Sequence, residues 1–211
     1  MRYDHKSHLL ILCSAFCYML IAIFARADYH YVSIDGMNQA PFTNWADAAT
    51  TIQAAITAAE THDTVVVGDG RYFGNGNTNI DFGGKDIILC AQSNQQAIID
   101  FMVNVRAFYL HGNETTNAVI QGFVIMNGSS NNYGGGIYAQ KGITIRNCII
   151  TSNTAEYGGG IYCLGSAVVE SSVLSSNRAN TQLGGGIYFT GSFLGVRDSF
   201  LSKNYGGGIY S

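Results

Sequence analysis

Charge is scarce in this sequence. Asp, Glu, Lys and Arg make up 12% of its 211 residues, and the formal net charge is −3 at pH 7. Proteins that bind nucleic acid present clustered Lys and Arg side chains to the phosphate backbone. This chain has 11 such side chains in total, so nucleic acid is not expected as a partner.

Cysteine is also sparse. Cys13 and Cys17 lie in an apolar N-terminal segment, which leaves Cys90, Cys148 and Cys163 in the rest of the chain. An odd number of cysteines without CxxC or metal-ligand spacing does not support a disulfide framework. We therefore expect three small buried side chains, no metal site and no cofactor.

Long apolar runs are absent except for one, from Leu9 to Ala25. It follows a basic start and ends in Ala25-Arg26-Ala27, a pattern typical of a secretory signal peptide (residues 1–27) cleaved between Ala27 and Asp28. The alternative is a retained membrane anchor, since about 17 apolar residues is the short limit for a span. Because no second run follows, we expect an exported, soluble mature chain without a transmembrane segment.

An internal repeat dominates the rest of the sequence. The string Gly-Gly-Gly-Ile-Tyr occurs four times, with starts 22 to 26 residues apart. A block of one apolar residue, two variable residues and asparagine precedes each of the last three strings. The strings occupy residues 134–138, 158–162, 184–188 and 206–210, and the blocks occupy 150–153, 174–177 and 201–204. Such a period indicates a solenoid.

Within each repeat, apolar and polar residues alternate, as in Ile143–Arg146 and Ala167–Glu170. This is the period of a β-strand, and the repeats contain no helix-length amphipathic stretch. A repeat therefore fits three short strands joined by turns, which form one coil of a parallel β-helix. One coil buries too little apolar surface to offset the cost of ordering its backbone, so only a stack of coils is stable.

Aligning the repeats places equivalent residues in columns along the stack. Four columns are predicted along the inside of the stack: Ile120, Ile145, Val169 and Val196; Phe123, Cys148, Ser172 and Ser199, around a bend; Ile125, Ile150, Leu174 and Leu201; Ile137, Ile161, Ile187 and Ile209. A turn column is predicted at Asn153, Asn177 and Asn204, where each amide can bond its neighbour and the local backbone. The triple glycines are expected to supply positive φ or a close approach of backbones.

Residues 28–64 are expected to cap the first coil. Ile52, Ala55 and Ile56 stand at helical spacing, and a short amphipathic helix there would shield the apolar edge of the first coil. The first strand is predicted at His62–Val67 and the coils over residues 65–211. The predicted fold class is all-β, a right-handed parallel β-helix (solenoid) with a short N-terminal capping helix.

Two resemblances follow from these motifs. Residues 45–72 resemble the capping helix and first coil of bacterial right-handed β-helix proteins of the pectate-lyase-like superfamily. The repeats resemble those of chlamydial polymorphic outer-membrane proteins, which pair FxxN with GGA[ILV], although this chain has Ile150, Leu174 and Leu201 in place of the phenylalanine. The resemblance implies the β-helix fold and a place outside the cell or on its outer surface.

The first resemblance also implies an alternative function, a polysaccharide lyase or glycoside hydrolase. Such enzymes need carboxylates that converge in one groove. The acidic residues concerned are Glu156, Glu170 and Asp198 in the repeats and Asp81, Asp86, Asp100 and Glu114 before them. They share no evident column. Asp100 together with Arg106 or Glu114 remains a candidate site, but the favoured interpretation is that these are turn residues. No catalytic residue is assigned.

Two outward columns are candidates for a functional surface. Arg146, Glu170 and Arg197 align with alternating charge, and a surface ion-pair ladder is the favoured interpretation. The second column is the tyrosine that ends each string, which alternation points outward after an inward isoleucine. Its members are Tyr138, Tyr162, Tyr188 and Tyr210. These stacked rings either form an amphipathic strip for sugar rings or a protein partner, or only cover the sheet.

From these patterns we predict a non-enzymatic, adhesin-like surface or secreted module that presents its tyrosine column to a polysaccharide or a surface protein. The sequence ends at Ser211, one residue after the fourth string. Because a solenoid needs a polar cap at both ends, we also expect a C-terminal continuation or end-to-end association with another subunit.

Overall fold

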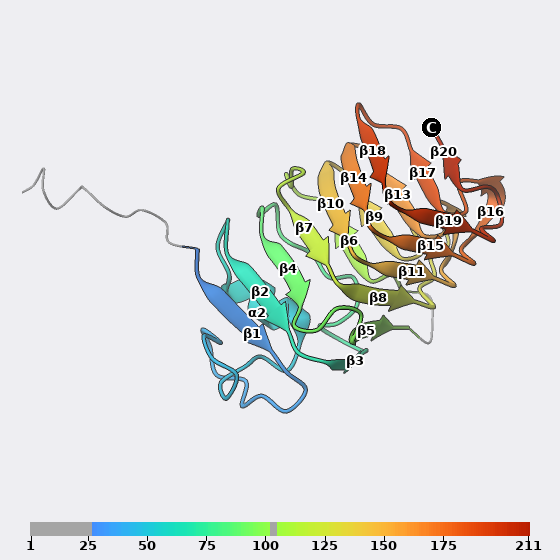
Figure 1. The fold of residues 1–211 in the computed structure, drawn as a ribbon. Coiled ribbons are helices and arrows are strands. Elements are labelled where there is room, and N and C mark those ends of the chain that lie inside the picture. The colour runs from blue at the N-terminus through green and yellow to red at the C-terminus, as the bar shows by residue number, and fades with distance from the viewer. Residues whose placement is uncertain (1–26, 102–104) are drawn as a thin grey trace, which may run out of the picture.

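The computed structural model describes residues 27–101 and 105–211, so the predicted signal peptide lies outside the described residues except for Ala27. The described chain winds into about six coils of parallel β-structure (Figure 1). Three sheets run along the stack, and the pairings between named strands are parallel. The predicted all-β parallel β-helix is confirmed.

From residue 88 onward, each coil contributes one strand to each of the three sheets, and the residues before it add strands to sheets 1 and 2 only. Sheet 1 contains β1 (Tyr29–Val32), β2 (Thr64–Val67), β4 (Ile88–Ala91), β7 (Val119–Gln121), β10 (Gly142–Arg146), β14 (Ser166–Glu170) and β18 (Leu194–Arg197). Sheet 2 contains β3 (Gly70–Tyr72), β5 (Ala97–Asp100), β8 (Phe123–Met126), β11 (Ile149–Thr151), β15 (Val173–Ser175) and β19 (Phe200–Ser202). Sheet 3 contains β6 (Phe108–Leu110), β9 (Ile137–Ala139), β13 (Ile161–Cys163), β17 (Ile187–Phe189) and β20 (Ile209–Tyr210). A separate pair, β12 (Thr154–Tyr157) and β16 (Arg178–Leu183), projects from the longer loops.

The apolar columns lie inside the stack in the predicted register. Ile145 pairs with Ile120 on one side and Val169 on the other, and all three side chains are fully buried. The same holds for the columns of Ile150 and Ile161. In the last coil Ile209 is 44% exposed, because no described coil packs beyond it.

The triple glycines play both predicted roles within one string. Gly134 has φ of +61°, a left-handed conformation that glycine adopts without the steric cost that a Cβ brings. At the next position the backbones of two coils meet: a Cβ on Gly135 would lie 2.5 Å from the carbonyl oxygens of Gly159 and Thr154. The strings therefore mark the corner at which the chain enters sheet 3.

The predicted capping helix is present as α2 (Ile52–Ala58). Thr51 caps its start by accepting a hydrogen bond from the N–H of Ala54, and Ile52 and Ile56 are buried against the first coil. At the other end, Lys85 Nζ donates to the carbonyl oxygens of Ile56 and Ala59, at 2.6 and 2.7 Å. A cation at this end also complements the helix dipole.

One strand precedes the strand that the sequence predicts as the first. β1 pairs in parallel with β2, so the chain enters sheet 1 before the helix. The sequence Tyr-His-Tyr-Val lacks the apolar alternation typical of a strand, because one of its two inward positions is His30 and the other is Val32. His30 is tolerated in the interior because its Nε2 lies 3.1 Å from Oδ2 of the buried Asp63.

The three cysteines of the described residues are free thiols. Cys148 and Cys163 are buried, and Cys90 is half-buried. Burial raises the pKa of both Cys148 and Cys163 to about 11, so these thiols stay protonated and unreactive at neutral pH. Within residues 27–101 and 105–211, no helix has the length and apolarity needed to cross a membrane.

Candidate functional site: a tyrosine strip on sheet 3

The tyrosines of the strings stand side by side on sheet 3. Tyr138 pairs with Tyr162, Tyr162 with Tyr188, and Tyr188 with Tyr210 in the strand register. The column begins one coil earlier than the repeats, because Tyr109 of β6 pairs with Tyr138. Sequence alignment misses Tyr109, since Phe108-Tyr109-Leu110 follows no triple glycine. We call these five residues the tyrosine strip.

The rings of the strip stack on one another. Ring centroids lie 5.6 Å apart for Tyr138 and Tyr162, 4.9 Å for Tyr162 and Tyr188, and 4.8 Å for Tyr188 and Tyr210. The corresponding interplanar angles are 5°, 6° and 17°. The faces of the inner rings are therefore covered by their neighbours. What the strip offers to a ligand is a row of ring edges and hydroxyls, not the flat faces on which sugar rings stack.

A second row of tyrosines from the loops leans on the strip. Tyr133 lies 4.6 Å from Tyr162 between ring centroids, and Tyr157 lies 5.5 Å from Tyr188. This row explains why Tyr162 is only 8% exposed although strand alternation points it outward. The sequence contained a signal for it: Tyr133 and Tyr157 each immediately precede a Gly-Gly-Gly-Ile-Tyr string.

The hydroxyls of Tyr138, Tyr162 and Tyr188 are neutral and available. Burial, reinforced by the neighbouring tyrosines, raises the pKa of Tyr162 to about 12 and shifts the pKa values of Tyr138 and Tyr188 in the same direction. No hydrogen bond among the described residues engages these three hydroxyls. They are also not among the buried, unpaired polar atoms, of which Glu114 Oε2 is the one found in the described residues. Each can therefore donate and accept hydrogen bonds at the surface of the strip.

A cation lies at the N-terminal end of the strip. The guanidinium carbon of Arg106 is 4.9 Å from the ring centroid of Tyr109 and 5.7 Å from that of Tyr138. Its Nη2 donates to Ser130 Oγ, and no carboxylate of the described residues pairs with it. Burial lowers the pKa of Arg106, but a guanidinium stays charged in proteins. A half-buried cation without a counter-charge thus borders the row of hydroxyls.

The asparagine column forms a continuous ladder inside the turn. Asn153 Nδ2 donates to Asn177 Oδ1 at 3.0 Å, and Asn177 Nδ2 donates to Asn204 Oδ1 at 3.1 Å. Each amide also donates to a carbonyl oxygen of the preceding coil, as Asn177 does to Ile150 at 2.9 Å. Asn153 and Asn177 are fully buried. This geometry gives the column a structural role, because the side-chain amides of Asn153 and Asn177 already use their hydrogen bonds within the stack.

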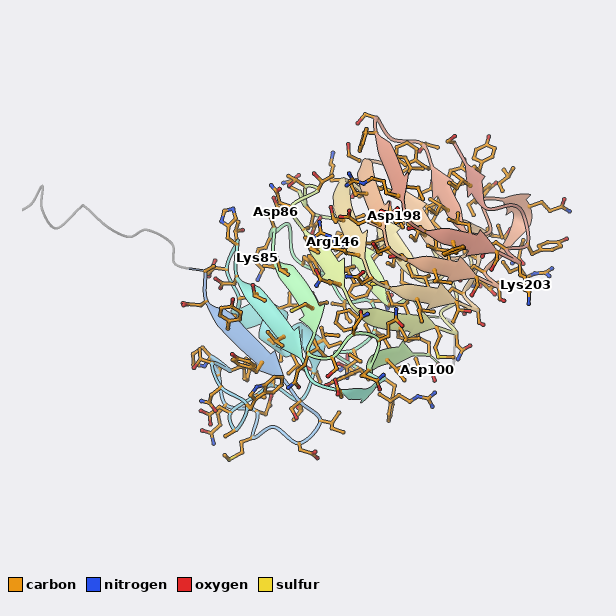
Figure 2. The ribbon with its side chains drawn as sticks, viewed as in Figure 1. Lys85, Asp86, Asp100, Arg146, Asp198 and Lys203 are labelled. Carbon is orange, nitrogen blue, oxygen red and sulfur yellow. The ribbon has the colours of Figure 1, made fainter. Side chains whose placement is uncertain are left out.

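The acidic residues before the repeats each serve a separate local contact. Asp81 lies near His111, Asp86 accepts from Thr115, Asp100 pairs with Arg71, and Glu114 accepts from the N–H of Gly84. Figure 2 shows Asp86 and Asp100 at well-separated parts of the coils. Arg106 contacts tyrosines instead of Asp100 or Glu114. Among the described residues no group of three or more His, Cys, Asp or Glu is placed to hold a metal ion.

The charged column on sheet 1 forms the ion-pair ladder expected of it. Glu170 Oε1 lies 2.7 Å from Arg146 Nε, and its Oε2 lies 3.2 Å from Arg197 Nη2. The hydrogen bond from Arg146 lowers the pKa of Glu170, and the charges of both arginines act in the same direction. Both arginine side chains are more than 40% exposed. Two arginines share one carboxylate, so the ladder keeps a net charge of +1, but both guanidinium groups are already paired with Glu170.

One comparison with known proteins gives a match. Residues 147–164 match the family model of the Chlamydia polymorphic membrane protein repeat. The segment runs from the bend before β11 to the end of β13, so it contains one asparagine block and one Gly-Gly-Gly-Ile-Tyr string. No curated protein and no solved structure matches the chain significantly. The predicted resemblance of the repeats is confirmed, and it points to a surface or outer-membrane protein repeat.

Proposed function

We propose that this chain is an exported surface module that binds a glycan or protein partner along its tyrosine strip and does not transform it. The observation that carries the proposal is the row of phenol rings with centroids 4.8 to 5.6 Å apart, in which no hydrogen bond among the described residues engages the hydroxyls of Tyr138, Tyr162 and Tyr188. A regular row of donors and acceptors suits an extended, repetitive partner lying along the stack, since each coil offers the same group again.

Export rests on the proposed signal peptide of residues 1–27, cleaved between Ala27 and Asp28. The proposed organisation of the mature chain is a cap over residues 28–64 followed by coils over residues 65–211. The match to a surface-protein repeat supports the same location outside the cell.

Arg106 favours a partner that carries acidic groups. Its guanidinium has five N–H donors, one of which is used by Ser130. Hydrogen bonds between a guanidinium and a carboxylate or sulfate are stronger than those between neutral groups. An acidic glycan, or a protein segment with an acidic side chain, would neutralise Arg106 and place its remaining polar groups on the hydroxyls of Tyr138 and Tyr162.

A binding screen against neutral and acidic polysaccharides, with product formation followed in the same wells, tests the proposal. The double substitution Tyr138→Phe and Tyr188→Phe removes two hydroxyls while keeping the stacked rings. We expect it to weaken binding at least tenfold, and Arg106→Gln to weaken binding of acidic ligands selectively. Tyr29→Phe is the matched control, because Tyr29 is exposed on β1, away from the strip.

Two outcomes would overturn the proposal. Binding that both hydroxyl-deleting substitutions leave unchanged would place the partner elsewhere on the molecule. New reducing ends or unsaturated products in the wells would show an enzyme, a polysaccharide lyase or glycoside hydrolase, and would redirect attention to Asp81, Asp86, Asp100 and Glu114.

A further inference from the structure

The backbone of Asp28 is seated against the start of β2. Its N–H donates a hydrogen bond to Oδ1 of Asp63 at 2.8 Å, and its carbonyl oxygen accepts one from the N–H of Thr64 at 2.9 Å. Ala27 and Asp28 are both exposed, whereas His30 two residues later is buried. Residue 28 therefore marks the point at which the chain leaves solvent and joins sheet 1.

Asp63 is a buried carboxylate without a permanent positive partner among the described residues. Its side chain is 8% exposed, and its Oδ2 accepts from the N–H of Glu60 at 2.7 Å and lies 3.1 Å from Nε2 of His30. Within residues 27–101 and 105–211, the N–H of Asp28 is the one hydrogen-bond partner of Oδ1, and no Lys or Arg forms an ion pair with Asp63. Lys85 donates to carbonyl oxygens at the end of α2 instead. The other titratable side chains of this corner are the His30 imidazole and the exposed carboxylates of Asp28 and Glu60.

A positive charge beside Oδ1 would complete this arrangement. Burial raises the pKa of Asp63, but the hydrogen bonds from Glu60, Asp28 and His30 outweigh it and lower the pKa, so the group is ionised at neutral pH. A buried charge is costly unless it is paired. Hydrolysis of the peptide bond between Ala27 and Asp28 gives a carboxylate on Ala27 and an amine on Asp28, and the amine takes up a proton at neutral pH. Removal of the signal peptide would thus create a cation at the required place.

We propose that the α-ammonium group of Asp28, formed when the signal peptide is removed, pairs with Asp63 and so secures β1 and the cap in the mature protein. The nitrogen does not have to move, because it already lies 2.8 Å from Oδ1. The ammonium group replaces one neutral N–H donor with three charged ones, and charge-assisted hydrogen bonds are the stronger kind. The precursor therefore holds its cap more loosely than the mature chain. This inference rests on the proposed cleavage between Ala27 and Asp28, and not on the tyrosine strip.

Amide hydrogen exchange of two purified forms tests the pairing. One is the mature chain, which begins with the free amine of Asp28. The other begins three residues earlier, at Ala25, and carries Arg26→Ala so that the extension has no charged side chain. We expect the amides of β1 and α2 to exchange about fivefold or more slowly in the mature chain, because the ion pair opposes local opening of the cap. The amides of β13 and β17 should exchange equally in both forms.

Asp63→Asn should abolish this difference, because an amide oxygen carries no charge to pair with the ammonium group. Glu60→Gln is the matched control, since it removes an exposed acid of the same turn and keeps Asp63, and it should leave the difference intact. A second measurement needs no variant: the acylation rate of the Asp28 α-amine is followed by mass spectrometry as a function of pH. Pairing with Asp63 should raise the pKa of this amine above its ordinary value of about 7.7–8.0. Acylation of the native protein should therefore begin at higher pH than acylation in urea.

Equal exchange in the mature and extended chains would overturn the proposal. A difference that persists in a folded Asp63→Asn protein would do the same, because it would arise from the extension itself and not from the ion pair. So would identical acylation profiles in the native and unfolded protein. Sequencing the N-terminus of the secreted full-length protein checks the cleavage point separately, and a first residue other than Asp28 would also overturn the inference. None of these results bears on ligand binding at the tyrosine strip, so failure here is distinct from failure of the binding screen.

Discussion

The N-terminal cap and the repeated coils are held together by different kinds of contact. The cap uses contacts that occur once, such as Lys85 on the end of α2 and the buried pair of His30 and Asp63. The repeats use the same contact again in each coil, as the hydrogen bonds from Asn153 to Asn177 and from Asn177 to Asn204 show. Both regions bury their apolar side chains in one continuous core.

The difference has a consequence for stability. In a stack, a repeated contact is shared between neighbouring coils, so damage at one coil weakens two interfaces. A contact that occurs once affects only the element that it holds. We therefore expect substitutions in the middle of a ladder to reduce global stability, and substitutions in the cap to loosen the cap first.

Asn177→Ala should have the largest effect. Asn177 Oδ1 accepts from both the backbone and the side chain of Asn153, at 3.1 and 3.0 Å, and its Nδ2 donates to the Ile150 carbonyl. Alanine would leave several buried polar groups unpaired, at about 1–3 kcal/mol each. We expect a loss of about 3–5 kcal/mol in the free energy of unfolding, measured by urea denaturation.

The matched variant for this prediction is Asn204→Ala. Asn204 stands at the end of the ladder and is only half-buried, so its loss should cost less than that of Asn177. Equal losses for the two variants would contradict the view that the ladder transmits stability between coils.

Ile56→Ala tests the cap. Ile56 is 1% exposed on the inward side of α2, and removing such a side chain costs about 2–4 kcal/mol through the lost transfer energy and the cavity. If the cap is held locally, amide hydrogen exchange should rise in α2 and β1 while β13 and β17 stay protected. Uniform loss of protection along the stack would show that cap and coils unfold as one unit.

The fold was largely predictable from the sequence because the repeats align with themselves. Once the strings and asparagine blocks are superposed, the columns of Ile145, Ile150 and Ile161 follow, and strand alternation assigns them inward. β1 escaped prediction because His30 occupies one of its inward positions. Its burial depends on Asp63, 33 residues away, which no local pattern displays.

The candidate site was predictable only in part, for a related reason. The repeats fix which tyrosines share a column, but the rotamers that stack the rings are set by packing between coils. Tyr109 lies before the repeats begin, and Tyr133 covers Tyr162 from a loop. Glu114 appears in the sequence as a turn residue, and its burial results from Gly84 of the preceding coil, whose N–H binds it.

Asp63→Asn should have a smaller, pH-dependent effect. Burial alone would raise the pKa of Asp63, but hydrogen bonds from the N–H groups of Glu60 and Asp28 and from His30 outweigh it and lower the pKa. A carboxyl with a lowered pKa stabilises the fold above its unfolded value of 3.8, and this contribution is lost as the pH falls below that value. We expect a cost of about 1–3 kcal/mol at pH 7.

Thermal unfolding of both proteins between pH 7 and pH 3 checks this sign. The difference in stability between wild type and Asp63→Asn should be constant above about pH 5 and should shrink below pH 3.8. A difference that grows as the pH falls would mean that Asp63 is not held in its ionised form.

Glu170→Gln should have the smallest effect, although it breaks two ion pairs of a repeated column. Ladder position alone would suggest a cost like that of Asn177, but Arg146 and Arg197 are largely solvated, and exposed pairs contribute about 0–1 kcal/mol. The cost should decrease further in 0.5 M salt, because exposed charges are screened. Urea denaturation at low and high salt, beside the exposed Glu60→Gln, measures it. A loss above about 2 kcal/mol in the free energy of unfolding would show that a repeated contact stabilises the stack even when it is exposed. The difference in stability between cap and coils would then depend on repetition and not on burial.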